Sequence, residues 1–190
     1  MDKKQALIRH EILNLITIVN FAVSSSELQD KNKKEILERL TLITLLVKYR
    51  DVFLGKEKEI FKRPVDLNEI LEAIAMIYEK QFKRNKVKLD IPRNETMIKM
   101  DRKLVQEALG QILVELMGHA KKIAITYKNG TLSIKYDSPQ KLTDKKINLM
   151  KCLTDKEKYP NFAYQLALHL LSLTGAKVKS GKGEMKISFK

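Results

Sequence analysis

The chain of 190 residues has 37 Lys and Arg against 23 Asp and Glu, a net charge of +14, and 44% of its residues are hydrophobic, enough for a buried core. A single cysteine, Cys152, excludes an internal disulfide, and no His or Cys residues stand at metal-ligand spacing, so we expect no metal site. The sequence contains no apolar run typical of a signal peptide or membrane span, and we therefore expect a soluble, cytoplasmic protein.

The positive charge favours an acidic partner, which by charge alone is a nucleic acid, an anionic membrane or an acidic protein. The basic residues are scattered, few aromatic residues lie among them, and no nucleic-acid-binding motif is present. Nucleic acid is therefore a disfavoured partner, and no membrane partner is expected. A solvated surface rich in Lys and Glu explains the charge more simply.

Two amphipathic helices are predicted within residues 1–60. In the first helix, apolar residues recur at heptad spacing: Ile8, Ile12, Leu15, Val19 and Ala22. After the polar stretch SSSELQDKNKK the second helix keeps this spacing and ends near Gly55: Ile36, Leu40, Ile43, Val47 and Leu54. We expect an antiparallel hairpin. Because two helices cannot hide all these apolar side chains, we also expect two copies to form a four-helix bundle.

A second domain is expected over residues 65–190. The segment GKEKEIFKRP, which ends in Pro64, is predicted to be a linker or a helix tail. Asp66 is expected to cap a helix running over LNEILEAIAMIYEKQFKRN, with Glu69 in capping-box position. A strand in KVKLDI, a short strand at 94–100 and a helix from about Asp101 to Met117 are predicted to follow.

The remaining elements alternate between strands and helices. Asn129-Gly130, between two alternating runs, is the strongest hairpin signal in the chain. Helices are predicted around KKINLMKCL and NFAYQLALHLLSLTG, the latter capped by Gly175, and two strands around residues 181–183 close the chain. The predicted fold class is α+β: a helical hairpin followed by an α/β sandwich in which helices cover one sheet.

The stretch RHEILN places polar residues inside the first helix. At about 100° per residue, His10 points away from the heptad row, and Asn14 and Thr17 follow it on the same face. An exposed imidazole is a good nucleophile toward phosphorus, Glu11 beside it can hold the proton of the other ring nitrogen, and Asn14 can bind a phosphoryl oxygen or orient water. The motif alone leaves an ordinary surface helix as the alternative.

IRHEILNLITIV resembles the H-box of two-component histidine kinases and histidine phosphotransferases, in which a phosphoacceptor His is followed by an acid and, three residues later, by Asn or Thr. A dimerising hairpin followed by a compact α+β domain is similar to the phosphotransfer and ATPase-like domains of that superfamily, over nearly the whole chain. The resemblance implies that His10 carries the phosphoryl group, Glu11 acts as acid/base partner, and Asn14 positions water or phosphate.

The nucleotide-binding motifs of that superfamily are altered in this sequence. LVQEALGQILVELMGHA resembles the N-box helix, but Glu107 and Gln111 stand in E-x-x-x-Q spacing where the family has E-x-x-x-N. In an alternative register, Gln111 and Glu115 occupy the two Asn positions. YDSPQK keeps Asp137 of the adenine-reading D-x-G-x-G loop, but Pro139 replaces its first glycine, and proline lacks the N–H and the freedom in φ that this loop needs.

The helix PNFAYQLALHLLSLTG resembles the family's phosphate-facing helix, with Phe162 and Tyr164 near the positions of its glycines. Three altered elements together imply an ATPase-like domain that has lost nucleotide and needs no cofactor. His119, His169 and Cys152 have no predicted role beyond structure.

The sequence therefore predicts a homodimeric histidine phosphotransferase that moves a phosphoryl group between response-regulator aspartates through His10. The expected partner is a receiver domain that supplies its own Mg²⁺, with Lys3, Arg9 and Thr17 as partner-binding residues. Two alternatives stay open. One is a divergent histidine kinase that still autophosphorylates from ATP, and the other is a non-catalytic interaction or nucleic-acid-binding module on the same fold.

Overall fold

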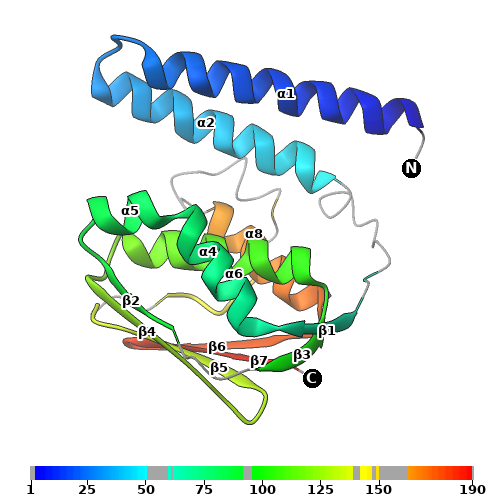
Figure 1. The fold of residues 1–190 in the computed structure, drawn as a ribbon, viewed down its shortest axis with the longest axis vertical. Coiled ribbons are helices and arrows are strands. Elements are labelled where there is room, and N and C mark those ends of the chain that lie inside the picture. Colours follow the sequence, from blue (N-terminus) through cyan, green and yellow to red (C-terminus); the bar gives the residue numbers. More distant parts are fainter. Residues whose placement is uncertain are drawn as a thin grey trace. The chain divides into compact units, whose positions relative to one another are not determined.

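The computed structural model describes residues 3–50, 60, 62–91, 96–138, 142–146, 149 and 162–189. It divides into two compact units, Met1–Lys58 and Glu59–Lys190. The first unit is a pair of helices, and the second combines helices with strands, as Figure 1 shows. Within the described residues no helix is long and apolar enough to cross a membrane.

In the first unit, α1 (Lys3–Ser25) packs against α2 (Asp30–Lys48). The connection between them is short, so the helices run antiparallel, and at the turn Lys33 Nζ donates a hydrogen bond to the Ser26 carbonyl at 3.3 Å. The predicted continuation of the second helix to Gly55 lies outside the described residues.

The face of α1 that packs against α2 is not the predicted heptad row. Within the unit the least exposed row contains Leu13, Ile16, Asn20 and Val23, and Ile16 is 8% exposed. Ile12, Leu15 and Val19 of the predicted row are 37%, 60% and 44% exposed. The two rows lie about 100° apart around the helix, so α1 is apolar on two adjacent faces and α2 covers only one of them.

The second unit contains four described helices and seven strands in this chain order: β1 (Arg63–Asp66), α4 (Leu67–Ile77), α5 (Glu79–Arg84), β2 (Lys88–Asp90), β3 (Met97–Met100), α6 (Arg102–Met117), β4 (Lys122–Lys128), β5 (Thr131–Tyr136), α8 (Phe162–Leu173), β6 (Lys177–Gly181) and β7 (Glu184–Ser188). Five strands form one sheet in the order β2-β4-β5-β7-β6, in which β2 and β4 are parallel and the other pairs antiparallel. The fold is therefore α+β with a mixed sheet.

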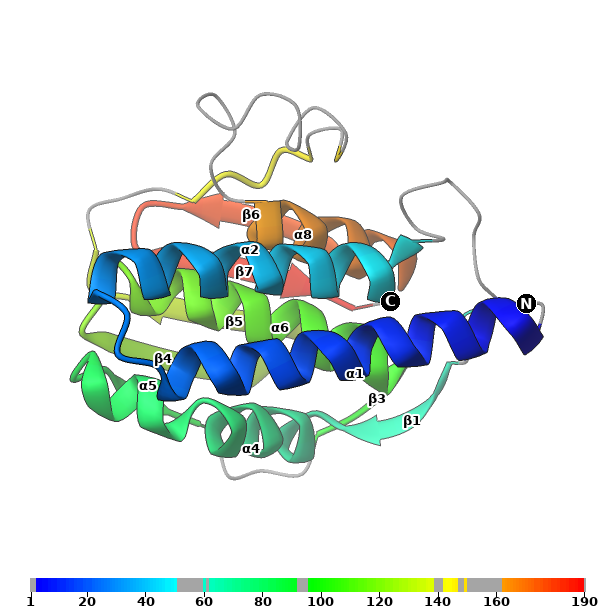
Figure 2. The same cartoon turned by 90° about the horizontal axis from the view of Figure 1, so that it is seen from above.

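The described helices of this unit lie on one side of the five-stranded sheet (Figure 1), and α6 lies between α4 and α8 (Figure 2). The core forms where α6 and α8 meet the sheet, and its fully buried side chains come from all three: Leu109, Ile112, Leu113, Leu116, Leu166, Leu170, Ile123, Leu132, Ile134 and Ile187. This packing fixes which residues of α6 and α8 stand near one another.

Several local predictions are confirmed. The helix over 102–117 begins at Asp101, whose Oδ1 accepts from the N–H groups of Lys103 and Leu104 at 3.0 and 3.2 Å. Asn129 and Gly130 adopt positive φ values of 51° and 74° in the hairpin between β4 and β5. Gly175, just after α8, has φ 84°, a value that glycine adopts without strain.

The predictions for Pro64 and for the helix that begins at Asp66 are wrong. Pro64 does not close a linker but lies inside β1, which pairs antiparallel with β3 in a separate two-stranded sheet, so there are two sheets instead of one. Proline is tolerated there because β1 has a neighbour on one side only. The helix predicted from Asp66 to residue 85 is interrupted at Tyr78, with φ −103° and ψ 12°. The helix predicted around KKINLMKCL lies mostly outside the described residues.

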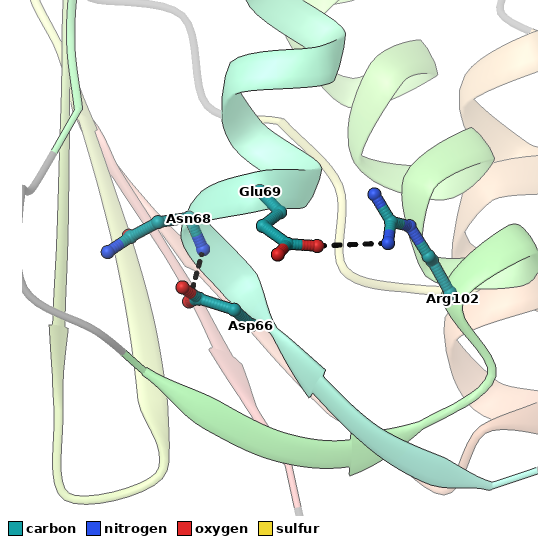
Figure 3. A network of polar contacts seen from close by, with 4 residues as sticks. All are labelled: Asp66, Asn68, Glu69 and Arg102. Carbon is teal, nitrogen blue, oxygen red and sulfur yellow. Dashed lines mark hydrogen bonds and ion pairs between the residues drawn. The ribbon is translucent and has the colours of Figure 1, made fainter.

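Asp66 lies at the start of α4 (Figure 3) and also binds the segment before β3. Its Oδ1 accepts from the N–H of Asn68 at 2.9 Å, which caps the helix as predicted, and from the N–H of Thr96 at 3.1 Å. Glu69 does not complete a capping box. Its Oε2 instead pairs with Arg102 Nη1 at 3.0 Å, which links the first turns of α4 and α6.

We predict that Asp66→Ala lowers the free energy of unfolding by about 1–2 kcal/mol, because two backbone donors lose their acceptor. Asp66→Asn keeps an acceptor oxygen and should retain most of this stability. Arg102→Ala removes only an exposed ion pair and should cost less than about 0.5 kcal/mol. Urea denaturation of the three variants measures these differences, and an equal loss in the Ala variants at positions 66 and 102 would contradict the prediction.

Candidate functional site

The polar strip on α1 is formed by His10, Asn14 and Thr17, all exposed on one face of the helix. Thr17 Oγ1 donates to the Leu13 carbonyl at 2.9 Å, so its proton is already committed to the helix backbone. Phe21, one turn further on the same face, is 76% exposed. The structure thus places the predicted nucleophile and its amide neighbour together, within reach of solvent.

The charged residues expected to assist His10 lie to either side of this strip. Glu11 is exposed, and its Cα is about 100° around the helix from that of His10, so its side chain lies on one flank of the strip. Arg9 is half-buried, in line with the row that α2 covers. Lys3 lies in α1, and its side chain is outside the described part of the structure.

Among the described residues of α1 and α2, His10 stands exposed on the outer surface of a helix. An exposed helix surface presents the imidazole on a convex face, and a convex face cannot exclude water or surround a phosphoryl group with donors. A phosphoryl donor that docks on the strip must therefore bring its own charge-stabilising groups.

In the second unit, the polar groups of the predicted N-box helix are paired with each other. Gln111 Nε2 donates to Glu107 Oε1 at 2.9 Å, and Glu115 Oε1 lies 3.2 Å from His119 Nε2. The residues of each pair are four apart in sequence; Glu107 and Gln111 join successive turns of α6, and Glu115 in the last turn of α6 meets His119 just beyond its end. In either register of the N-box, the side chains that would face a metal already have a partner on α6 or just after its end.

Tyr78 lies beside this cluster, at the break between α4 and α5. A Cβ added to Gly110 would stand 3.3 Å from its ring carbon Cε2, so the ring packs directly against the backbone of α6. Burial raises the pKa of Tyr78, and the nearby charge of Glu107 raises it further.

Asp137, expected at the adenine-reading position, serves as a backbone acceptor. Its Oδ1 accepts from the N–H groups of Lys121 and Lys122 at 2.8 and 2.9 Å, which ties the end of β5 to the start of β4. The hydrogen bond from the Lys122 N–H is the largest of the effects that hold the pKa of this carboxyl below its ordinary value.

Two aromatic residues occupy the beginning of α8, where the histidine kinase resemblance predicts glycines. Phe162 is buried, and Tyr164 is 2% exposed with its hydroxyl donating to the Thr143 carbonyl at 2.7 Å. Burial raises the pKa of Tyr164, and Tyr136 and the charges of Glu115 and Asp144 raise it further. Tyr164 therefore occupies the region between α6 and the segment 142–146.

Sequence reasoning missed these internal partners. His119 was expected to be structural, but its contact with Glu115 was not foreseen, although their spacing of four on a helix was a usable signal. The segment that contains Thr143 was expected to be a loop or the start of a helix, and nothing in its sequence indicates that it accepts a bond from Tyr164. Within the described residues, no three His, Cys, Asp or Glu side chains gather into a metal site.

Comparison with known proteins adds information on the fold. No family model and no curated protein matches the chain. Among solved structures, the Acinetobacter baumannii histidine kinase AdeS matches over 96% of this chain and 94% of its own, with 13% identity and a TM-score of 0.60. The cytoplasmic segment of histidine kinase QseC matches over 87% of this chain and 97% of its own, with 14% identity and a TM-score of 0.51.

Full-length ShkA, solved in complex with AMPPNP, matches over 97% of this chain but only 45% of its own, with 15% identity and a TM-score of 0.58. AdeS and QseC are named as histidine kinases. At these identities the likeness concerns the fold, and the chain has a histidine kinase-like fold.

We predict that Tyr164→Phe lowers the free energy of unfolding near neutral pH by about 1 kcal/mol, because the Thr143 carbonyl loses its donor. In the native state the raised pKa keeps Tyr164 neutral above pH 10, whereas an unfolded tyrosine ionises near pH 10. The stability that the hydroxyl supplies is thus present below about pH 10 and is lost as the pH rises above it. Urea denaturation at about pH 8 and about pH 10.5 should therefore show the gap between wild type and variant shrinking. A gap independent of pH would contradict this.

Proposed function

We propose that the chain is a histidine phosphotransferase of a two-component phosphorelay, which accepts a phosphoryl group from the aspartate of one response-regulator receiver domain and passes it to another through His10. The histidine kinase-like fold and the exposed strip of His10, Asn14 and Thr17 support a phosphoacceptor. The observation that favours a phosphotransferase over a kinase is Tyr164, which fills the start of α8 and is bonded to Thr143.

The proposed transfer uses groups that stand on α1. A neutral nitrogen of His10 attacks the phosphorus of an aspartyl phosphate, a P–N bond forms, and the P–O bond breaks so that the carboxylate leaves with the electron pair. The imidazole ring thereby gains a positive charge, which the Glu11 carboxylate stabilises from the flank. Asn14, one turn away, donates to a phosphoryl oxygen, and the reverse sequence of steps delivers the group to a second aspartate.

The partner supplies the remainder of the site. Because α1 presents a convex surface, the receiver domain brings the Mg²⁺ that neutralises the phosphoryl oxygens, and this chain needs no cofactor of its own. Lys3 and Arg9 attract the acidic receiver, and Thr17 contacts it beside His10.

The kinase alternative is favoured by one finding, that the structurally similar ShkA was solved with AMPPNP. The paired Glu107, Gln111, Glu115 and Asp137 weigh against it, because binding a nucleotide would first require breaking these contacts. The non-catalytic alternative predicts salt-sensitive nucleic acid binding that His10→Ala leaves unchanged.

We predict that phosphoramidate, a small phosphoryl donor, yields phosphohistidine on the wild-type protein and on His119→Ala, but not on His10→Ala. His119 is the matched control because it is a second described histidine with a partly exposed ring. Phosphorus NMR detects the product, and the labelled protein should lose its phosphoryl group to purified receiver domains in the presence of Mg²⁺. Glu11→Gln and Asn14→Ala should slow that transfer by about 10- to 100-fold.

Incubation with radiolabelled Mg-ATP, together with calorimetric titration, should give neither label nor binding. Acid-labile label from ATP that disappears in His10→Ala would overturn the proposal in favour of a kinase. Phosphohistidine on His10 that no receiver domain accepts would contradict the phosphorelay role.

The exposed apolar row of α1 supports the homodimer. Ile12, Leu15 and Val19 are at least one-third exposed, and Ile43 of α2 is 43% exposed, so the hairpin by itself leaves apolar area in water. A second copy that covers this row would complete a four-helix bundle through residues 1–55 and leave the opposite strip with His10 open.

We predict that Val19→Lys or Leu15→Lys weakens dimerisation at least about tenfold, because each buries a charge in an apolar interface. Phe21→Lys is the matched control, since Phe21 is as apolar and more exposed but lies on the strip with His10. Analytical ultracentrifugation over a range of concentrations measures the effect. Equal weakening by Phe21→Lys, or a monomeric wild type, would contradict the prediction.

A further inference from the structure

The five-stranded sheet has one face that no described helix of its unit covers (Figure 1). Residues alternate along each strand, so the buried side chains of β4, β5 and β7 point toward the helices and the residues between them point outward. The outward positions of the five strands carry seven lysines, all exposed: Lys88, Lys122, Lys128, Lys135, Lys177, Lys179 and Lys186. We call this set the sheet lysines.

Some of the sheet lysines stand directly opposite one another. Lys88 faces Lys122 across β2 and β4, and Lys179 faces Lys186 across β6 and β7. Like charges in directly opposed cross-strand positions destabilise a sheet. An anionic partner on this face would relieve that repulsion.

Acidic residues do little to neutralise this face. The outward acids of the five strands are Asp90 and Glu184. Glu184 is already engaged, since Ser133 Oγ donates to its Oε1 at 2.7 Å and Lys186 Nζ lies 3.2 Å from its Oε2. The face therefore keeps a strong positive charge.

The helices on the other side of the sheet do not share this excess of positive charge. α4, α5 and α6 together carry five acidic and five basic residues, and ion pairs join Glu79 to Lys83 at 2.6 Å and Glu69 to Arg102 at 3.0 Å. The excess positive charge of the described unit is thus concentrated on the open face of the sheet.

The residues between the sheet lysines indicate which anionic partner fits. They are small or carry a hydroxyl group: Ala124, Thr126, Thr131, Ser133 and Ser188. Among the outward positions of these five strands there is no aromatic residue and no arginine. Single-stranded nucleic acid is bound by stacking on aromatic rings, duplexes are read by arginine and by elements that enter a groove, and stable protein interfaces have an apolar centre depleted in lysine.

An anionic lipid surface needs none of these features. A cluster of four to eight basic residues is sufficient to attract it, and each contributes about 1 kcal/mol near the headgroups. We propose that the sheet lysines hold this unit against the anionic headgroups of a membrane, peripherally and without insertion. The proposal goes beyond phosphotransfer. It also departs from the expectation of no membrane partner, which rested on the lack of an apolar span.

The test compares two triple variants of the full chain with equal loss of charge. One changes the sheet lysines Lys122→Gln, Lys135→Gln and Lys179→Gln, and the control changes the helix side with Lys80→Gln, Arg84→Gln and Lys103→Gln. The probe is vesicles of equal parts phosphatidylcholine and phosphatidylglycerol, with pure phosphatidylcholine as the neutral reference, and binding is measured by co-sedimentation at about 0.1 M salt. Matching circular dichroism and melting temperature establish that both variants are folded.

We expect the wild type to bind the anionic vesicles, to lose this binding at about 0.5 M salt, and to ignore the neutral ones. The sheet variant should bind roughly a hundredfold more weakly, and the control within about fivefold of wild type. Equal weakening in both variants would show that net charge alone acts, and would overturn the proposal. Absence of vesicle binding by the wild type, or tighter binding to a duplex DNA at the same salt, would overturn it as well.

Discussion

The contact between α6 and α8 on one side of the five-stranded sheet determines the arrangement of the second unit. Leu109, Ile112 and Leu113 of α6 and Leu166 and Leu170 of α8 are fully buried against the strands. Because this layer is closely packed, the side chains at its margin have fixed neighbours. Tyr164 can donate its hydrogen bond to Thr143 because the apolar residues beside it hold α8 in place.

The two units contribute different chemistry to the proposed reaction. The first presents a nucleophile, His10, on an open helix surface, and this suits a partner that carries both electrophile and metal. In the second, the side chains that resemble nucleotide-binding residues are bonded to one another, as in the pairs Gln111–Glu107 and Glu115–His119. On the proposed function, a histidine kinase-like fold would thus combine an accessible phosphoacceptor with a region in which the side chains that resemble nucleotide-binding residues are already paired.

Most predictions that rest on short-range chemistry agree with the structure, the capping box at Glu69 excepted, whereas several that depend on tertiary contacts do not. Asp66 and Asp101 cap helices, and Asn129-Gly130 turns a hairpin, because each of these signals acts within a few residues. At the helix break, the ring of Tyr78 packs on Gly110. Gly110 lies 32 residues further along the chain, so no short sequence pattern around Tyr78 indicates the break. For the same reason the strand at Pro64 was not predicted: its partner β3 is separated from it in the sequence by α4 and α5.

The predictions for the candidate site divide in the same way. The exposure of His10 and Asn14 follows from helical periodicity, so the sequence could predict it. Heptad spacing could not decide which of two adjacent faces of α1 packs against α2, because both faces carry enough apolar side chains to form a helix contact. The bond from Tyr164 to Thr143 joins residues 21 apart and was beyond any pattern in the sequence.

The burial of Tyr164 at the start of α8 has one consequence for signalling if the proposed function holds. A phosphotransferase whose folded state binds no nucleotide would have no linkage to nucleotide concentration, so neither its stability nor its shape would respond to the energy charge of the cell. On the proposed function, the flow of phosphoryl groups through His10 would then depend only on how many receiver aspartates are phosphorylated. The protein would transfer phosphoryl groups between these aspartates in the direction set by their relative extents of phosphorylation.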